Sequence, residues 1–286
     1  MMAVNVEQRL PRLIFGIDPR YLAGQESALV NALNGNPGVP TFTPPRPFER
    51  GVGRRPTLVQ NVETLAHLAL IARHGADWFR QLGTPRHQRS ALVTLSGALA
   101  APGVSEIEHG TSLIEPLQST GVEDELSAVL VDGHFGTWLT ASEAPGVRLA
   151  GEYLAGYSAT LGAGVIVALG ASPCPVAETS RIADSFAAES AGRRGPCVYG
   201  LDAIAHTIHQ LPTGTATRHA HAQLEPGMRE LPRRGACQQP DGAVRFIASS
   251  LRVFEPEFRD HARRGRCGRC SGSAVLPAPI SLRRRG

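Results

Sequence analysis

Residues 189–197 of this 286-residue chain read Glu-Ser-Ala-Gly-Arg-Arg-Gly-Pro-Cys, and a second cysteine follows at Cys237 in the run Gly-Ala-Cys. The loop has the outline of an iron–sulfur site, in which several thiolates come from one short loop and one comes from elsewhere in the fold. Only Cys197 and Cys237 stand where such ligands would stand. Taken alone, this spacing favours two ordinary half-buried thiols over a metal site.

Two longer segments upstream carry a more specific signal. Residues 21–29 read Tyr-Leu-Ala-Gly-Gln-Glu-Ser-Ala-Leu, and residues 55–65 read Arg-Pro-Thr-Leu-Val-Gln-Asn-Val-Glu-Thr-Leu. In this order they resemble the motifs Y-x-x-G-E-E-[ST]-A-L and K-P-T-x-V-N-N-V-E-T-L of the flavin- and NADH-binding subunit of bacterial complex I. Relatives of that subunit occur in NAD-linked hydrogenases and formate dehydrogenases. The resemblance covers residues 21–259, and it is stronger to an actinobacterial branch than to the respiratory subunit.

The resemblance implies a fold class of α/β plus α+β. Residues 1–82 would form the C-terminal part of an FMN- and NADH-binding α/β domain, and residues 88–171 a β-grasp (ubiquitin-like, SLBB-like) domain. Residues 172–262 would form a helical bundle of the iron–sulfur-binding type, followed by an Arg- and Pro-rich tail at 263–286. The family's glycine-rich FMN phosphate loop is absent from residues 1–20, so we expect the first domain to be amino-terminally truncated.

Local patterns agree with this order of domains. A short apolar run at 13–15 predicts a strand, and β-branched or alternating patterns predict strands at 90–96 and 125–131. Apolar residues at helical spacing predict helices. These lie at 23–34, 57–74, 111–117, 176–188, 200–211 and 242–254.

The resemblance also implies which residues would contact the nucleotide cofactors. The positions that match the family's FMN and NADH site are Gly24, Glu26, Gln60, Asn61 and Thr64. Backbone N–H groups at a loop-to-helix turn bind phosphate well. Asparagine and threonine also cap helices, so helix capping is an equal alternative for Gln60, Asn61 and Thr64.

The cysteine loop resembles the family pattern S-C-G-x-C-x-x-C. Cys197 matches the third ligand and Cys237 the fourth, whereas Ala191 and Arg194 replace the first and second cysteines. Arginine is always protonated and offers no lone pair to iron. We therefore expect the [4Fe–4S] site to be incomplete, because two missing ligands disfavour a stable cubane.

Cys267 and Cys270 form a C-x-x-C pair in the tail. Such a pair supplies two thiolates from one tight turn and needs a second pair to complete a metal site. The further ligands that we consider are His261 and either Cys197 or Cys237, whichever lies close enough to the C-x-x-C pair. A labile dithiol is the favoured alternative, and Cys174, between two prolines, is predicted to be structural.

Composition excludes several classes of function. The net charge is +4 and the basic residues are all arginine, but the arginine runs lack interleaved aromatic residues, which argues against nucleic-acid binding. Five scattered cysteines argue against a secreted disulfide scaffold and favour the cytoplasm. The apolar window 149–171 contains Glu152 and several glycines. We therefore expect no direct membrane insertion, and any peripheral membrane association would pass through partners.

The resemblance implies an NADH dehydrogenase activity, in which electrons pass from NADH through FMN and an iron–sulfur cluster to a partner. That partner would be another subunit of a redox complex or a ferredoxin-like acceptor. The replaced ligands and the absent glycine-rich loop predict that this activity is impaired in the chain alone. A non-catalytic docking module of a redox complex and a truncated remnant are the alternatives.

Overall fold

The computed structural model describes residues 13–17, 21–190, 192, 195–217, 220–235 and 237–277. Its centre is a five-stranded sheet with the strand order β2-β1-β5-β3-β4. The strands are β1 (Ser90–Gly97), β2 (Gly103–Glu108), β3 (Leu126–Val131), β4 (Thr137–Thr140) and β5 (Val165–Gly170). The middle strand β5 runs parallel to β1 and antiparallel to β3, while the two outer pairs are antiparallel hairpins.

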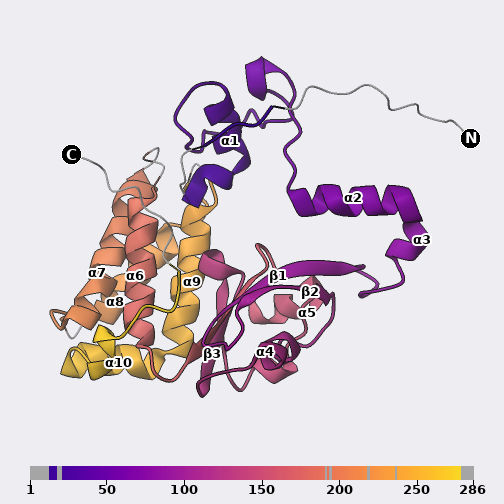
Figure 1. The fold of residues 1–286 in the computed structure, drawn as a ribbon. Coiled ribbons are helices and arrows are strands. Elements are labelled where there is room, and N and C mark those ends of the chain that lie inside the picture. Colours follow the sequence, from indigo (N-terminus) through magenta and orange to yellow (C-terminus); the bar gives the residue numbers. More distant parts are fainter. Residues whose placement is uncertain are drawn as a thin grey trace, which may run out of the picture.

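Both faces of this sheet are buried. Ala128 and Leu130 belong to a core shared with the helices that follow the sheet in the chain, whereas Val129 and Val131 belong to a second core on the opposite face. Successive side chains of a strand point to opposite faces, so a strand covered on both sides is apolar at nearly every position. The second face is covered by α4 (Ile114–Thr120) and α5 (Gly151–Leu154), as Figure 1 shows.

Five helices follow the sheet and share one core with its first face (Figure 1). They are α6 (Pro175–Ala188), α7 (Leu201–Thr213), α8 (Ala220–Glu230), α9 (Gln239–Val253) and α10 (Glu255–Arg264). Helix α9 lies nearest to the sheet and also covers the edge strand β4. The Ser249 hydroxyl accepts a hydrogen bond from the Trp138 N–H at 3.0 Å, and Arg252 donates to the Trp138 carbonyl at 2.7 Å. An edge whose polar groups are satisfied in this way is protected from pairing with another chain.

The first part of the chain is packed less tightly. It contains α1 (Glu26–Leu33), α2 (Val62–His74) and α3 (Ala76–Phe79). Tyr21, just before α1, donates its N–H to Glu189 at 3.1 Å, and its ring contacts Phe135 and Phe186. Helix α2 buries none of its residues and projects away from the rest of the molecule with α3 (Figure 1).

Most of the predicted elements are confirmed, with shifted bounds. The predicted helix at 57–74 begins only at Val62, because Asn61 caps it, and it ends at Gly75 as expected. The predicted strand at 13–15 is wrong. Residues 13–15 are irregular and exposed, and no strand among the described residues pairs with them, as a strand would require. None of the helices formed by the described residues has the length and hydrophobicity needed to span a bilayer.

Candidate metal centre

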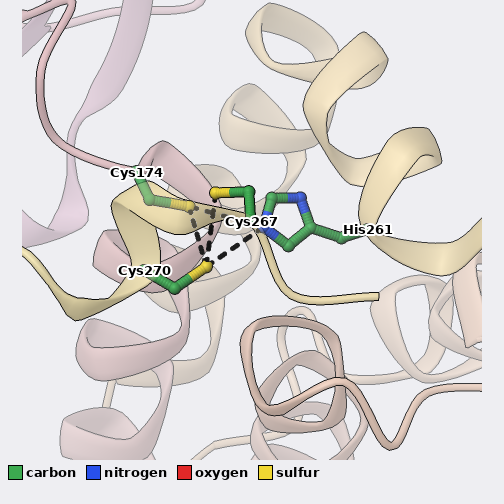
Figure 2. A group of neighbouring side chains, drawn as sticks. All are labelled: Cys174, His261, Cys267 and Cys270. Carbon is green, nitrogen blue, oxygen red and sulfur yellow. Dashed lines mark hydrogen bonds between the residues drawn. The ribbon is translucent and has the colours of Figure 1, made fainter. Parts of the chain in front are cut away.

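Four potential metal ligands from three separate segments meet beside the bundle, as Figure 2 shows. Cys174 immediately precedes α6, and His261 lies in the last turn of α10. Cys267 and Cys270 flank a tight turn in the tail, where the Cys270 N–H donates to the Cys267 carbonyl at 3.2 Å. The ligand atoms of the four side chains all lie within 4.8 Å of one another. We call these four residues the Cys₃His group.

The individual distances within the Cys₃His group are short. His261 Nε2 lies 3.2 Å from Cys270 Sγ and 3.6 Å from Cys174 Sγ. Cys270 Sγ lies 3.5 Å from the sulfur atoms of both Cys174 and Cys267. The other ring nitrogen, His261 Nδ1, donates to the Glu257 carbonyl at 2.7 Å. This hydrogen bond leaves the Nε2 lone pair directed at the three sulfurs.

The group also has an unusual electrostatic environment. Partial burial raises the pKa of the Cys267 thiol, but hydrogen bonds from Cys270 and Cys174 outweigh it and bring this pKa to about 6. Burial raises the pKa of Cys174 and of Cys270. For His261, burial lowers the pKa, but the hydrogen bond with Cys270 and the Glu257 carbonyl leave it above its ordinary value. A thiolate beside an imidazole is thus favoured near neutral pH.

The structure places Cys267 and Cys270 beside His261, the partner considered from the sequence, but the further thiol is Cys174. Neither Cys197 nor Cys237 belongs to a group of three or more potential ligands among the described residues. Cys197 is buried and lies in the helical turn Pro196–Gly200 just before α7, and Cys237 is half-buried with a pKa raised by burial. Ala191 and Arg194 lie outside the described residues.

The residues predicted to contact FMN and NADH are not gathered into one cradle. Gly24 and Glu26 lie at the start of α1, whereas Gln60, Asn61 and Thr64 lie at the start of α2, which Figure 1 shows well apart from α1. Asn61 Oδ1 accepts a hydrogen bond from the Thr64 N–H at 2.7 Å, so Asn61 caps the helix. A hollow of about 710 Å³ beside α1 is lined by other residues, including Ser27, Asn31, Arg50 and Arg54. The flavin contacts remain a prediction.

Comparisons with known proteins agree on one family. Residues 177–261 match the iron–sulfur binding region of NADH-ubiquinone oxidoreductase F. The second F-type subunit of NADH-quinone oxidoreductase in Rhizobium meliloti is 30% identical over 251 residues, which are 86% of this chain and 59% of the relative. The F-type subunit of the Streptomyces coelicolor enzyme is 29% identical over 243 residues, covering 84% of this chain and 54% of the relative.

A solved structure of an NAD⁺-reducing [NiFe]-hydrogenase in the H₂-reduced state is also similar, with a TM-score of 0.79 and 32% identity over 85% of this chain and 42% of that chain. The chain is thus similar to F-type subunits of NADH-quinone oxidoreductase over most of its own length. It spans 59% and 54% of the two curated relatives described above.

Similarity to the F-type subunits implies FMN and a [4Fe–4S] cluster, but the donor set of this chain does not fit the cluster. A [4Fe–4S] cluster needs four ligands, normally thiolates. At the family's ligand positions this chain offers Cys197 and Cys237, while Ala191 and Arg194 provide no donor. The Cys₃His group does not replace the missing ligands, because its ligand atoms lie within 4.8 Å of one another and leave no room for eight iron and sulfide atoms.

Proposed function

We propose that this chain is a subunit of an NADH-linked electron-transfer complex that binds partner subunits but does not carry a [4Fe–4S] cluster on its own side chains. The observation that carries this proposal is the donor set of two cysteines within a fold that is otherwise similar to the family over most of the chain. Its place would be the cytoplasm, with any contact to a membrane made through partners.

The proposed domains are those expected from the family. A β-grasp domain at 88–171 is supported by the strand order with a central parallel pair, β1 and β5, and by the helix α4 on one face. A helical domain at 172–262 is supported by the separate core that α6, α7 and α9 form against the other face. Because a single core joins the helices to one face of the sheet, we expect these two domains to move as one rigid body.

The surface proposed for docking is the apolar face of α2. Val62 is 83% exposed and Leu68 is 61% exposed, and Leu65 lies beside them on the helix. Exposed apolar residues clustered on one element are typical of an interaction site. The occupant that we propose is the flavin-bearing part of the NADH-oxidising unit. The reason is that α2 lies within the segment, residues 1–82, that resembles the C-terminal part of the relatives' flavin-binding domain, and this chain spans just over half of those relatives.

Co-purification tests this docking proposal. The tagged chain, isolated from the cells that produce it, should bring down bound FMN and an NADH-oxidising activity with ferricyanide as acceptor, while the chain expressed alone should show neither. The variant Leu65→Ser/Leu68→Ser should lose at least about 90% of the recovered activity, because it removes the apolar contact. The control Val104→Ser changes an equally exposed side chain on β2 and should retain the activity. Activity in the isolated chain, or equal recovery with both variants, would contradict the proposal.

Anaerobic reconstitution with iron and sulfide tests the statement about the cluster. After reduction, the variant Cys267→Ser/Cys270→Ser, which keeps the natural residues at positions 191, 194, 197 and 237, should give no EPR signal of a [4Fe–4S] cluster. Restoring the family ligands in that background with Ala191→Cys/Arg194→Cys should create the signal, and the additional change Cys237→Ser should abolish it. A stoichiometric cluster in the natural chain that depends on Cys197 and Cys237 would establish the electron-carrier function instead.

A further inference from the structure

We propose that the Cys₃His group binds a single zinc ion, which fastens the C-terminal segment of the chain to the helical bundle. The group lies outside the cluster positions of the F-type family, and its chemistry differs from theirs. The proposal therefore does not depend on the proposed function.

The distances within the group fit one metal ion. Zinc binds cysteine sulfur at about 2.3 Å in a tetrahedron, which places neighbouring ligand atoms roughly 3.7 Å apart. The ligand atoms of the Cys₃His group show separations of 3.2, 3.5 and 3.6 Å, and none exceeds 4.8 Å. An iron–sulfur cluster holds its thiolates farther apart, because iron and sulfide atoms lie between them.

The donor set also selects zinc. Three cysteines and one histidine are a common set for structural zinc, and sulfur donors in a tetrahedron exclude magnesium and calcium, which prefer oxygen. All four positions are filled by protein side chains, so the site is closed in the manner of a structural centre rather than open for catalysis. Cys174 and His261 are only 2% and 4% exposed, respectively, and the other two ligands are half-buried.

Contacts outside the ligands hold them in place. The Glu257 carbonyl accepts from His261 Nδ1 and fixes the tautomer that presents Nε2 to a metal. Arg269, inside the C-x-x-C turn, donates to the Ala171 carbonyl at 2.8 Å, which ties this turn to the loop before α6. Cys270 lines a surface hollow of about 490 Å³, through which an ion can enter.

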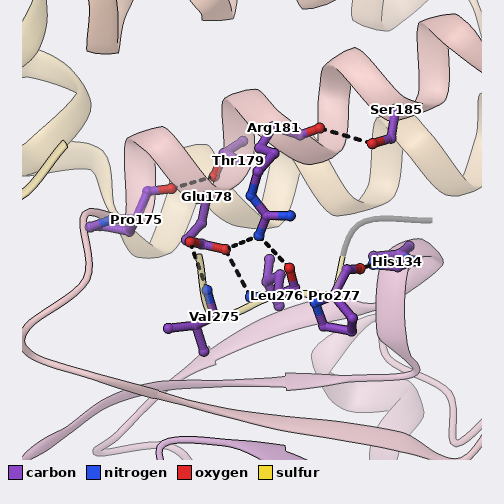
Figure 3. Close-up of polar contacts among 9 residues, drawn as sticks. All are labelled: His134, Pro175, Glu178, Thr179, Arg181, Ser185, Val275, Leu276 and Pro277. Carbon is purple, nitrogen blue, oxygen red and sulfur yellow. Dashed lines mark hydrogen bonds and ion pairs between the residues drawn. The ribbon is translucent and has the colours of Figure 1, made fainter. Parts of the chain in front are cut away.

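The chain beyond the Cys₃His group shows what the metal would fasten (Figure 3). The N–H groups of Val275 and Leu276 donate to the Glu178 carboxylate at 3.0 and 2.9 Å, and Arg181 donates to the Leu276 carbonyl. Farther along, His134 Nε2 lies 2.7 Å from the Pro277 carbonyl, next to the sheet. Residues 267–277 therefore form a strap across α6, and the zinc would anchor its first end to both Cys174 and α10.

Metal analysis of the full chain, purified with reductant and without added metal, is the first test. We expect about one zinc per chain in the natural protein and in the control Cys197→Ser/Cys237→Ser, which removes two thiols outside the group. Cys174→Ser and Cys267→Ser should each lower the zinc content at least about tenfold. Cys267→His should retain zinc, because imidazole is also a zinc ligand, and this variant separates metal binding from a purely structural role of the thiol.

Cobalt substitution and proteolysis complete the test, and they do not require the variants to fold. Cobalt(II) in the natural chain should give thiolate charge-transfer bands and the intense d–d absorption of tetrahedral coordination, and zinc should displace it. Removing zinc with a chelator should speed tryptic cleavage after Arg266 and Arg269 at least about tenfold, and added zinc should reverse this. Iron in place of zinc, a Cys267–Cys270 disulfide without metal, or a cleavage rate that the chelator does not change would overturn the proposal.

Discussion

The chain contains two regions that differ in how they use apolar residues. From residue 90 to residue 277, the sheet and the helices bury theirs in two cores, and α9 bonds the backbone N–H and carbonyl of Trp138 on the edge strand β4. From residue 13 to residue 79, apolar side chains such as Leu58, Val62 and Leu68 face outward, and α2 buries nothing. The first region determines the stability of the molecule, whereas the second exposes an apolar surface that we propose binds a partner subunit.

The largest expected effect comes from the core of the stable region. Phe246 is fully buried on α9, with its ring centroid 5.9 Å from that of Phe186 and 6.3 Å from that of Trp138. Phe246→Ala should lower the free energy of unfolding by about 3–5 kcal/mol, because it leaves a cavity that its neighbours cannot fill. Urea unfolding followed by circular dichroism measures this change.

The matched control for this prediction lies in the open region. Phe48 is 60% exposed, and Phe48→Ala should change the free energy of unfolding by less than about 0.5 kcal/mol. Equal losses in the free energy of unfolding for Phe246→Ala and Phe48→Ala would mean that the two regions do not differ in their contribution to stability.

An intermediate effect is expected where the strap crosses α6. Glu178 is buried and accepts from two backbone N–H groups, so Glu178→Ala would leave both donors without this partner. We expect a loss of about 1–3 kcal/mol in the free energy of unfolding, measured with zinc held constant. Glu225→Ala, which removes only an exposed ion pair with Arg229, should cost less than about 0.5 kcal/mol. A loss at Glu178 no larger than at Glu225 would show that the strap adds no stability.

The smallest effect is expected on α2. Leu68→Ser in the isolated chain should change the free energy of unfolding by less than about 0.5 kcal/mol, because the side chain is already in contact with water. A loss above about 1.5 kcal/mol in thermal or urea unfolding would show that α2 packs on the rest of this chain and would remove the basis for a docking face.

The sequence predicted those elements whose signal is local. Helices with regular apolar spacing, such as α6 and α9, were recovered to within a few residues. Strand β5 is not predicted, because a strand buried on both faces has no alternation of apolar and polar residues. Helix α10 was missed because it is mostly charged.

The Cys₃His group shows the same limit at the level of a site. The C-x-x-C pair and His261 were visible in the sequence because they are near neighbours in the chain. Cys174 lies far upstream, and only the packing of α6 against α10 brings its sulfur to them. A cysteine directly before the proline that starts a helix was the one local sign that its position is fixed.

The position of β5 between β1 and β3 has a consequence for biosynthesis. The hairpins β1–β2 and β3–β4 share no ladder until β5 pairs with both, and β5 ends only at Gly170. A nascent chain on the ribosome therefore carries two unjoined hairpins until Gly170 has left the exit tunnel. The time between the emergence of β4 and the emergence of Gly170 from the tunnel thus sets how long these hairpin edges stay unpaired.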